Sequence, residues 1–429
     1  MIEEPGTGLP ARQAALTLLS GVLRKHKPLD AQLDVLKTLA PRDAGFARAL
    51  ASQTLRHFGS LDSLLRQFVP KPLAPHKAGP ATEILLLGAC ELLILKVPAH
   101  AAVDAANNLA AADNKAVHFK SLINAVLRRV SREGAELRGG RDNARLNTPD
   151  WLWNRWLAEY GVETARRIAD AHGKEAPLDI VLKEGASFPE STALFGNVRR
   201  LNESGRVDEL AGFAGGDWWV QDAGATLPVA LLGDVKGKRV IDLCAAPGGK
   251  TMQLAAAGAE VTAVELDAAR LERVAENLAR TKLTATLVQD DARDFGGTAP
   301  FVLIDAPCTA TGTIRRHPDL PWIKGAEDVT ARAAAAYELL ESGAAMVEPG
   351  GLLVFAVCSL EAEEGEEQIE TFLIDHPEFT REAVTAADLF DHAEWISAAG
   401  DLRTLPSDLG ELGGMDGFYA ARLRRLQTP

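Results

Sequence analysis

The sequence predicts an α/β protein, in which a doubly wound, mostly parallel sheet follows an all-α bundle and a small connector domain. Three observations support this prediction. Residues 8–135 are rich in Ala and Leu at helical spacing, and short apolar runs alternate with helical stretches from about residue 216. The segment between these regions is polar and has only short periodic stretches. We therefore expect domains at 1–140, 141–215 and 216–429.

The first domain is expected to consist of helices throughout. The stretch "LPARQAALTLLSGVLRKH" has apolar residues at helical spacing and is bounded by Pro10 and Pro28. The same period returns in four later stretches: "DAGFARALASQTLRHFGSLDSLLRQFV", "PATEILLLGACELLILK", "AHAAVDAANNLAAAD" and "FKSLINAVLRRVSRE". β-Branched runs are few, which is typical of a helical bundle.

The connector begins with "GAELRGGRDNARLNTPD", a Gly- and Arg-rich stretch typical of a linker. "WLWNRWLAEYGVETARRIADAHG" then predicts a helix, and "APLDIVLKE" a short strand.

The third domain contains five compact apolar runs of strand length: "RVIDLC", "EVTAVELD", "TATLVQDD", "FVLIDAP" and "GLLVFAVCS". Helical stretches separate them, so a parallel sheet with helices on both faces is expected. "DGFYAARLRR" predicts one further strand, antiparallel and at or near an edge.

Composition narrows the class of protein. The chain has 429 residues, 47% of them hydrophobic and 24% charged, as in ordinary globular proteins. The start "MIEEPGTG" resembles neither a secretory signal nor a transit peptide, and the longest apolar run is interrupted by Glu91. Four cysteines without a CxxC pair argue against a disulfide framework or a zinc site. We expect a cytoplasmic monomer without a metal and without a membrane segment.

Charge is unevenly distributed. The net charge is −13, yet residues 1–150 contain 20 Lys and Arg against 14 Asp and Glu, while the remainder contains 26 against 45. Such asymmetry favours a basic partner-binding module joined to an acidic catalytic one.

A cofactor loop is predicted at "VIDLCAAPGGKT", residues 240–251. A phosphate loop is excluded, because Cys244 stands where that motif requires Gly, and the GxGxxG fingerprint is absent as well. The small residues let a ligand approach a helix N-terminus closely. Glu265, which ends the next strand, can hold ribose hydroxyls; Asp290 and Asp291 follow a third strand, near the adenine edge, and Asp305 follows a fourth. Carboxylates in these positions suit a cationic, non-phosphorylated nucleoside, so we expect S-adenosylmethionine.

The motifs around two cysteines extend this interpretation. "DAPCTATGTIRRHPD" and "VCSLEAEEGEEQI" place Cys308 and Cys358 after successive strands. Together with "DLCAAPGGKT" they resemble the motifs of RNA (cytosine-5)-methyltransferases. "VPAHAAVDAANNLA" and "INAVLRR" resemble the NusB-like N-terminal domain of the Sun-type enzymes, which methylate small-subunit ribosomal RNA. The resemblance implies a class I, Rossmann-like methyltransferase that uses S-adenosylmethionine and acts on 16S ribosomal RNA.

Methylation of cytosine at carbon 5 explains why such an enzyme would need a thiol. Carbon 5 of cytosine is a poor nucleophile until a thiolate adds at carbon 6. By spacing alone, Cys308 is a candidate for that attack. The resemblance instead implies that Cys358 attacks and that Cys308 assists release, with both thiols on adjacent strands and Asp305 at the base. Cys90 and Cys244 are interpreted as packing residues, although Cys244 lies within the cofactor loop.

Two sets of binding residues are expected. For RNA these are Arg315, Arg316 and Lys250; guanidinium groups beside the catalytic turn can hold phosphates. His317 receives no role. For the cofactor they are Cys244, Ala245, Ala246, Pro247, Gly248, Gly249, Lys250, Glu265, Asp291 and Asp305.

Some positions depart from the family pattern. Val357 replaces the usual Thr, the Asn after the paired glutamates is absent, "LDIVLK" lacks an Arg-Val-Asn pattern, and "DDAR" replaces a Gly-Asp-Gly-Arg loop. Two alternatives stay open: a transfer-RNA (cytosine-5)-methyltransferase, and a non-catalytic NusB-like RNA-binding or assembly factor. The intact cysteines, Asp305 and Gly-Gly loop argue against the second.

Overall fold

The computed structural model describes residues 8–69, 71–202 and 205–427. The chain folds into two compact units. One, here called the helical unit, comprises the described residues up to Lys174 together with Ile314–Gly325. The other, the sheet unit, comprises Glu175–Thr313 and the described residues from Ala326 onward.

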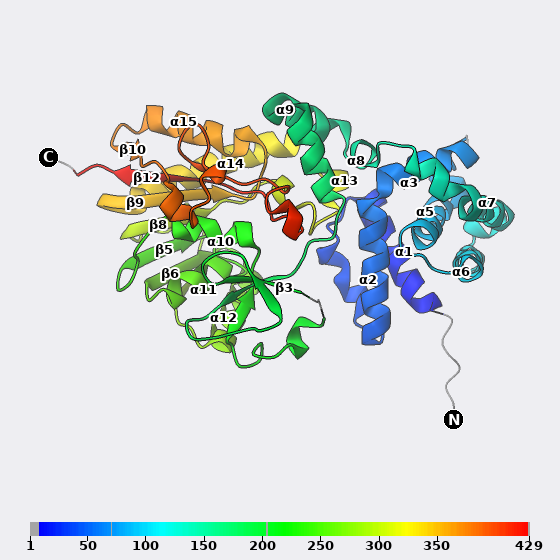
Figure 1. Ribbon diagram of the computed structural model, residues 1–429, viewed down its shortest axis with the longest axis horizontal. Coiled ribbons are helices and arrows are strands. Elements are labelled where there is room, and N and C mark those ends of the chain that lie inside the picture. The colour runs from blue at the N-terminus through cyan, green and yellow to red at the C-terminus, as the bar shows by residue number, and fades with distance from the viewer. Residues whose placement is uncertain (1–7, 70, 203–204, 428–429) are drawn as a thin grey trace. The chain divides into compact units, whose positions relative to one another are not determined.

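The helical unit confirms the predicted N-terminal bundle (Figure 1). Buried Leu and Ala side chains from α1, α2, α3, α5, α6 and α7 form one continuous core. Its helices are α1 Leu9–Lys25, η1 Asp30–Leu36, α2 Pro41–Arg56, α3 Phe58–Phe68, α4 Pro75–Ala78, α5 Ala81–Leu93, α6 Ala99–Ala111, η2 Ala116–Phe119, α7 Lys120–Gly139, α8 Asn143–Leu146, α9 Asp150–His172 and α13 Leu320–Ile323.

A segment from the middle of the α/β sequence completes this unit. In Ile314–Gly325, the indole Nε1 of Trp322 donates to the carbonyl of Leu55 at 3.0 Å, and its ring meets Phe58 edge-on at 4.7 Å. The Asp319 carboxylate accepts from the backbone N–H of Leu29 at 2.8 Å. These contacts attach the segment to helices that precede it by more than 250 residues, as the separation of 267 between Leu55 and Trp322 shows.

The segment predicted as a connector is divided between the units. Helix α9 belongs to the helical unit, whereas the strands that follow belong to the sheet unit. These strands form a small antiparallel sheet in the order β2-β3-β1-β4, with a buried Arg200–Asp179 ion pair at 2.7 Å. Their bounds are β1 Asp179–Leu182, β2 Ser191–Ala193, β3 Val198–Leu201 and β4 Trp218–Val220, with η3 at Val207–Glu209.

The main sheet confirms the predicted α/β architecture. Its strand order is β10-β12-β9-β8-β5-β6-β7, and β11 pairs with β12. Strands β7, β6, β5, β8 and β9 are parallel, while β12 runs antiparallel between β9 and β10, as predicted for the last strand. The bounds are β5 Arg239–Leu243, β6 Glu260–Glu265, β7 Thr286–Gln289, β8 Ala299–Asp305, β9 Val347–Val357, β10 Phe379–Arg381, β11 Leu402–Arg403 and β12 Tyr419–Arg425.

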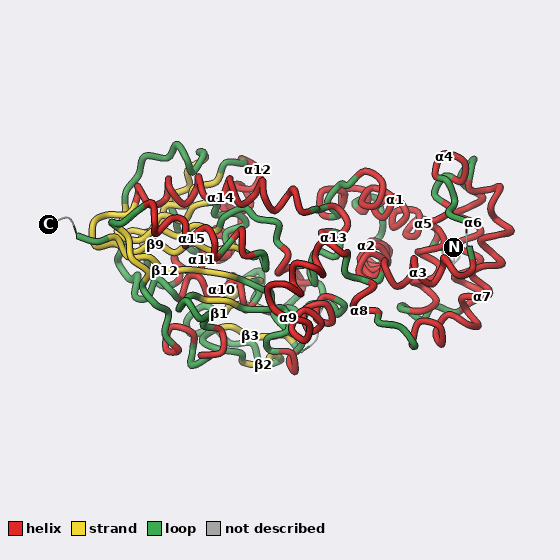
Figure 2. Tube along the Cα trace, turned by 90° about the horizontal axis from the view of Figure 1, so that it is seen from above, coloured by secondary structure: helices red, strands yellow, loops and turns green. Residues whose placement is uncertain are grey.

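Helices cover both faces of this sheet (Figure 2). Val302 and Ile304 of β8 share a core with Leu340 of α14, whereas Leu303 between them shares another with Leu227 of α10. This alternation is what a strand buried on both faces requires. The remaining helices are α10 Ala223–Ala230, α11 Gly249–Ala256, α12 Ala268–Thr281, η4 Thr311–Thr313, α14 Ala326–Met346, η5 Ala362–Glu364, α15 Glu366–Asp375, η6 Ala386–Leu389, η7 Ala393–Trp395 and η8 Gly410–Leu412.

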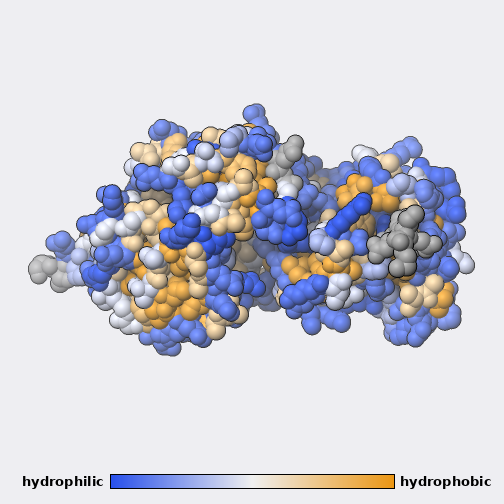
Figure 3. Space-filling model, turned by 90° about the horizontal axis from the view of Figure 1, so that it is seen from below, coloured by the Kyte–Doolittle hydropathy of each residue, from blue (hydrophilic) through white to orange (hydrophobic). Residues whose placement is uncertain are grey.

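The surface mixes hydrophilic and apolar side chains, as the face in Figure 3 illustrates. Large exposed apolar residues, such as Leu266 and Ile374, are far apart in the sequence. Among the described residues, no helix combines the length and apolar character needed to cross a bilayer.

Candidate active site

The predicted functional residues follow the carboxyl ends of adjacent parallel strands. Strands β6, β5, β8 and β9 are neighbours, and Asp305 pairs with Ala356 in the register between β8 and β9. The carboxyl ends of parallel strands meet at one edge of a sheet, where ligands of open α/β folds bind. The predicted adjacency of the two cysteine-bearing strands is therefore confirmed.

The two cysteines are in contact. The Sγ atoms of Cys308 and Cys358 are 3.5 Å apart, and both residues are free thiols that are partly buried. The hydrogen bond with Cys358, followed by burial and by the charges of Cys358 and Glu364, holds the pKa of the Cys308 thiol well above its ordinary value. Cys308 therefore remains a neutral thiol beside Cys358.

Lys250 and Asp305 form an ion pair at the same edge. The Lys250 Nζ lies 2.8 Å from the Asp305 Oδ2 and 5.1 Å from the centre of the Phe418 ring. Only 7% of Lys250 is exposed, while the Asp305 carboxylate is about one-third exposed. Lys250 thus lies buried at this edge of the sheet rather than on an open surface.

A cavity of about 330 Å³ lies beside the cofactor loop. Glu265, Asp291, Arg270 and Cys244 line it, together with apolar side chains, and Pro307, which lines it too, directly precedes Cys308. Of the predicted cofactor residues, this cavity brings together Cys244, Glu265 and Asp291. Because of Pro307, it borders the loop that bears one of the thiols.

The loop from Cys244 to Lys250 has the tight backbone expected for a close approach to a ligand. Ala245, Ala246 and Pro247 lead to Gly248, which adopts φ +101° at the start of α11, a conformation that favours glycine. A Cβ at Gly249 would come within 3.2 Å of Gln221, so a side chain there would crowd its neighbour. The N–H of Ala246 donates to the buried Glu265 carboxylate at 3.3 Å.

The acidic residues of the cavity differ in their partners. Glu265 is 3% exposed, and besides Ala246 it accepts from the N–H of Asp267 at 3.1 Å. Asp291 accepts from both the Nε and the Nη2 of Arg293, at 3.0 and 2.6 Å, and these hydrogen bonds lower its pKa to about 2. Asp291 is thus ionised near neutral pH.

Further residues considered from the sequence belong to the helical unit or are thiols interpreted as packing residues. Arg315, Arg316 and His317 belong to the helical unit, where Arg315 is 1% exposed and Arg316 is partly exposed. His317 Nδ1 lies 3.4 Å from Asp30. Burial raises the pKa of both Cys90 and Cys244 to about 12, so neither thiol ionises near neutral pH. Among the described residues, no group of His, Cys, Asp and Glu could hold a metal ion.

One residue at this edge was not singled out from the sequence. Glu364 is fully buried and accepts hydrogen bonds from Thr309 and Ser359, the residues that follow the two cysteines. The acidic run "EAEEGEE" gave a weak signal, since it contains several glutamates and only the tertiary contacts distinguish the buried one.

Comparisons with known proteins agree with this geometry. A family model described as 16S rRNA methyltransferase RsmB/F matches residues 229–424, and a NusB family model matches residues 9–132. Ribosomal RNA small subunit methyltransferase B of Pseudomonas putida is 37% identical, covering 97% of this chain and 98% of its own. The protein of the same name from Pasteurella multocida is 32% identical, with 97% and 96% covered.

Solved structures agree on the fold. The crystal structure of PH0851 superposes with a TM-score of 0.76 at 22% identity, covering 99% of this chain and 100% of its own. A methyltransferase homolog protein from Pyrococcus horikoshii superposes with a TM-score of 0.53 at 25% identity, covering 68% and 97%. The chain is a methyltransferase of the α/β class, and it belongs to the RsmB/F family of 16S rRNA methyltransferases. The predicted family and fold are confirmed.

Proposed function

We propose that this protein transfers a methyl group from S-adenosylmethionine to carbon 5 of a cytosine in 16S ribosomal RNA, with Cys358 as the nucleophile. The observation that supports this most strongly is the pair of thiols, 3.5 Å apart at the sheet edge beside the Lys250–Asp305 ion pair. Two free thiols in contact suit a reaction that must first form and then break a bond to sulfur.

The cavity fits the proposed cofactor. In this proposal Glu265 binds the ribose hydroxyls and Asp291 the adenine edge, since both line the cavity together with Cys244 of the cofactor loop. A relative in fold, NSun6 from Pyrococcus horikoshii, was solved with SFG; it has a TM-score of 0.54 at 17% identity. S-adenosylmethionine would supply an electrophilic methyl group on a positively charged sulfur.

In this proposal the side chains of the site act on the bonds that form and break during methyl transfer. The Cys358 thiolate adds to carbon 6 of the cytosine, which forms an S–C6 bond and gives carbon 5 the electron density to accept the methyl group. Asp305 hydrogen-bonds the N3/N4 edge as charge develops there, and Lys250 orients Asp305. Water then takes the proton from carbon 5, the electrons of that C–H bond restore the ring double bond, and the S–C6 bond breaks with its electrons going to the Cys358 sulfur.

Cys308 assists this second half of the reaction. Its sulfur lies next to the one that must leave, and its raised pKa keeps it a thiol while Cys358 attacks. Cys308 can therefore act on the departing Cys358 without competing for carbon 6.

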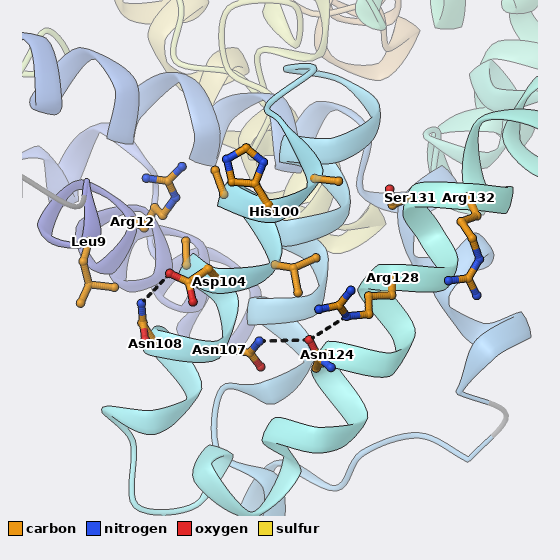
Figure 4. A pocket seen from close by; sticks show the side chains of 14 residues that line it. Leu9, Arg12, His100, Asp104, Asn107, Asn108, Asn124, Arg128, Ser131 and Arg132 are labelled. Carbon is orange, nitrogen blue, oxygen red and sulfur yellow. Dashed lines mark hydrogen bonds between the residues drawn. The ribbon is translucent and has the colours of Figure 1, made fainter.

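The helical unit contributes RNA binding in this proposal. A groove of about 760 Å³ runs between α6 and α7 beside the start of α1 (Figure 4). Arg128 and Arg132 project from α7 at its rim, and Asn107 and Asn124 bond to each other at 3.3 Å within it. Guanidinium groups can bind phosphates, and amides can bind base edges. This groove suits a single-stranded RNA segment.

Contacts by the predicted RNA residues remain part of the proposal. Lys250 would act at the flipped base, because it is buried beside Asp305. Arg316 is partly exposed and can reach a phosphate, whereas the burial of Arg315 favours a role in packing.

A substrate panel tests the proposed activity. Wild-type protein is incubated with cofactor and with 16S ribosomal RNA, assembling small subunits or transfer RNA, and the digested nucleosides are identified by mass spectrometry. We expect 5-methylcytidine from the ribosomal substrates only. Product from transfer RNA alone would favour the transfer-RNA alternative, and no product with retained RNA binding would favour a non-catalytic assembly factor.

A further inference from the structure

A buried carboxylate lies behind the two thiols. Glu364 ends the short helix η5 and is 0% exposed. Burying a carboxylate is unfavourable unless hydrogen bonds or a cation compensate for the lost hydration. No Lys or Arg pairs with Glu364 in the part of the chain that the structure describes, so hydrogen bonds alone stabilise it.

These hydrogen bonds come from two loops. Thr309 donates its backbone N–H at 2.8 Å and its hydroxyl at 2.5 Å, and Ser359 donates its hydroxyl at 2.5 Å. Thr309 directly follows Cys308, and Ser359 directly follows Cys358. A single carboxylate therefore joins the neighbours of both thiols, although these are 50 residues apart in the chain.

The sheet alone does not fix the distance between the thiols. Strand β8 ends at Asp305 and β9 ends at Val357, so Cys308 and Cys358 both lie beyond the ladder of backbone hydrogen bonds. Other links join the same loops: the Gly312 N–H donates to the Cys358 carbonyl at 3.0 Å, and the Thr309 and Ser359 hydroxyls lie 3.5 Å apart. The side chain of Glu364 adds to these links by accepting from both hydroxyls.

We propose that Glu364 is a positioning residue, whose carboxylate holds the Cys308 and Cys358 loops so that both thiols reach one cytosine. This role rests on the proposed two-thiol mechanism. The charge of Glu364 also contributes, after the nearer effects of Cys358 and burial, to the raised pKa of Cys308. Misplacement of a reacting group by 1 Å can cost about 10²-fold in rate, so this link is expected to matter for turnover.

The test compares Glu364→Gln with Glu364→Ala, and Glu367→Gln serves as control because Glu367 is exposed on the adjoining helix α15. The amide of Gln cannot accept from all three donors at once. We expect kcat on 16S ribosomal RNA to fall by about 10-fold in Glu364→Gln and about 100-fold in Glu364→Ala, while KM for the cofactor stays within about twofold. Glu367→Gln should match wild type.

A second measurement requires neither RNA nor cofactor. Folded full-length protein is treated with oxidised glutathione, and formation of the Cys308–Cys358 disulfide is followed by peptide mass spectrometry. Thiols held in contact should form this disulfide at least fivefold faster in wild type than in Glu364→Gln. Thr309→Val, which keeps the backbone donor, should give an intermediate rate even where Glu364→Ala does not fold.

The two readouts separate the inference from the proposed function. Wild-type protein without 5-methylcytidine product would reject the function, while the disulfide rate would still test the link. If Glu364→Gln equals wild type in disulfide rate and in kcat, Glu364 does not position the thiols. A fall in melting temperature with unchanged disulfide rate and kcat would likewise overturn the proposal, since it indicates a purely structural residue.

Discussion

At the scale of single residues, burial changes the pKa of Asp242, which lies near the cofactor loop. It lies in β5, is 0% exposed, and accepts from the Thr251 hydroxyl at 2.6 Å. Burial, as the largest effect, raises its pKa from an ordinary 3.8 to about 7. The folded protein therefore holds a proton at this site between about pH 4 and 7, where the unfolded chain has released it.

This difference gives Asp242 a defined effect on stability. A carboxyl group whose pKa is raised by folding favours the folded state below that pKa, and the advantage falls as pH rises from about 4 to 7, by up to roughly 1.4 kcal/mol per pH unit. Asp242→Asn removes this dependence, so its free energy of unfolding should rise relative to wild type over that range. Chemical denaturation at several pH values measures it.

A second carboxyl group provides the control for this measurement of stability against pH. Asp234→Asn, at an exposed position in the same unit, is the control for the loss of one carboxyl group. If the difference between Asp242→Asn and wild type does not change with pH, folding does not raise the pKa of Asp242.

At the scale of elements, the loop after β8 depends on one close approach of backbone to backbone. A Cβ at Gly312, in η4, would lie 2.1 Å from the carbonyl oxygen of Gly417, and the Gly417 N–H donates to Gly312 at 2.9 Å. Since Gly312 also donates to the Cys358 carbonyl, only glycine keeps the loop at this distance from both partners.

Gly312→Ala is therefore expected to separate the loops that bear the thiols. We predict a loss of about 1–3 kcal/mol in stability and of about 10²-fold in methyl transfer. Denaturation curves and single-turnover assays measure the two effects. Gly296→Ala is the matched control, because no atom lies within 4 Å of a Cβ there. Equal activity of the two variants would show that the loop tolerates the shift.

The positions of strands and helices were the part of the fold that the sequence predicted best. Apolar runs such as those before Asp305 and Cys358 are buried on both faces, and this burial gives them a strong local pattern. Cys308 and Cys358 could be placed together for the same reason, since adjacent parallel strands end at one edge.

Contacts between segments that are distant in the sequence could not be predicted from local sequence patterns. Asp319 binds the backbone of Leu29, 290 residues away, so no local period indicates that Ile314–Gly325 joins the helical unit. Arg315 was predicted to bind RNA but is buried, and the sequence did not distinguish the buried Glu364 from the other glutamates of its run. Each depends on its neighbours in space.

At the scale of the whole molecule, positive charge is concentrated in the N-terminal part of the chain, which also contains the proposed RNA-binding groove. Residues 1–150 carry a positive excess, although the protein has a net charge of −13. The groove between α6 and α7 lies in this basic region and is lined by Arg128 and Arg132. Binding of a polyanion there should depend on salt, because bound phosphates release counterions.

Arg128→Ala/Arg132→Ala is expected to weaken binding of 16S ribosomal RNA by roughly tenfold and to reduce the slope of log K against log salt by about 1 to 2. Fluorescence anisotropy of the full-length protein at several salt concentrations measures both. Arg66→Ala, an exposed position on α3, is the control. An unchanged slope would exclude the groove as a phosphate-binding surface.

The measurement that tests the central claim most directly uses the thiol pair itself. Wild type, Cys308→Ala, Cys358→Ala and the control Cys90→Ala are incubated with labelled 16S ribosomal RNA and cofactor, then separated on denaturing gels. We predict that Cys308→Ala accumulates a covalent protein–RNA band and that Cys358→Ala is inactive without one. A covalent band in Cys358→Ala and none in Cys308→Ala would contradict the account and make Cys308 the nucleophile.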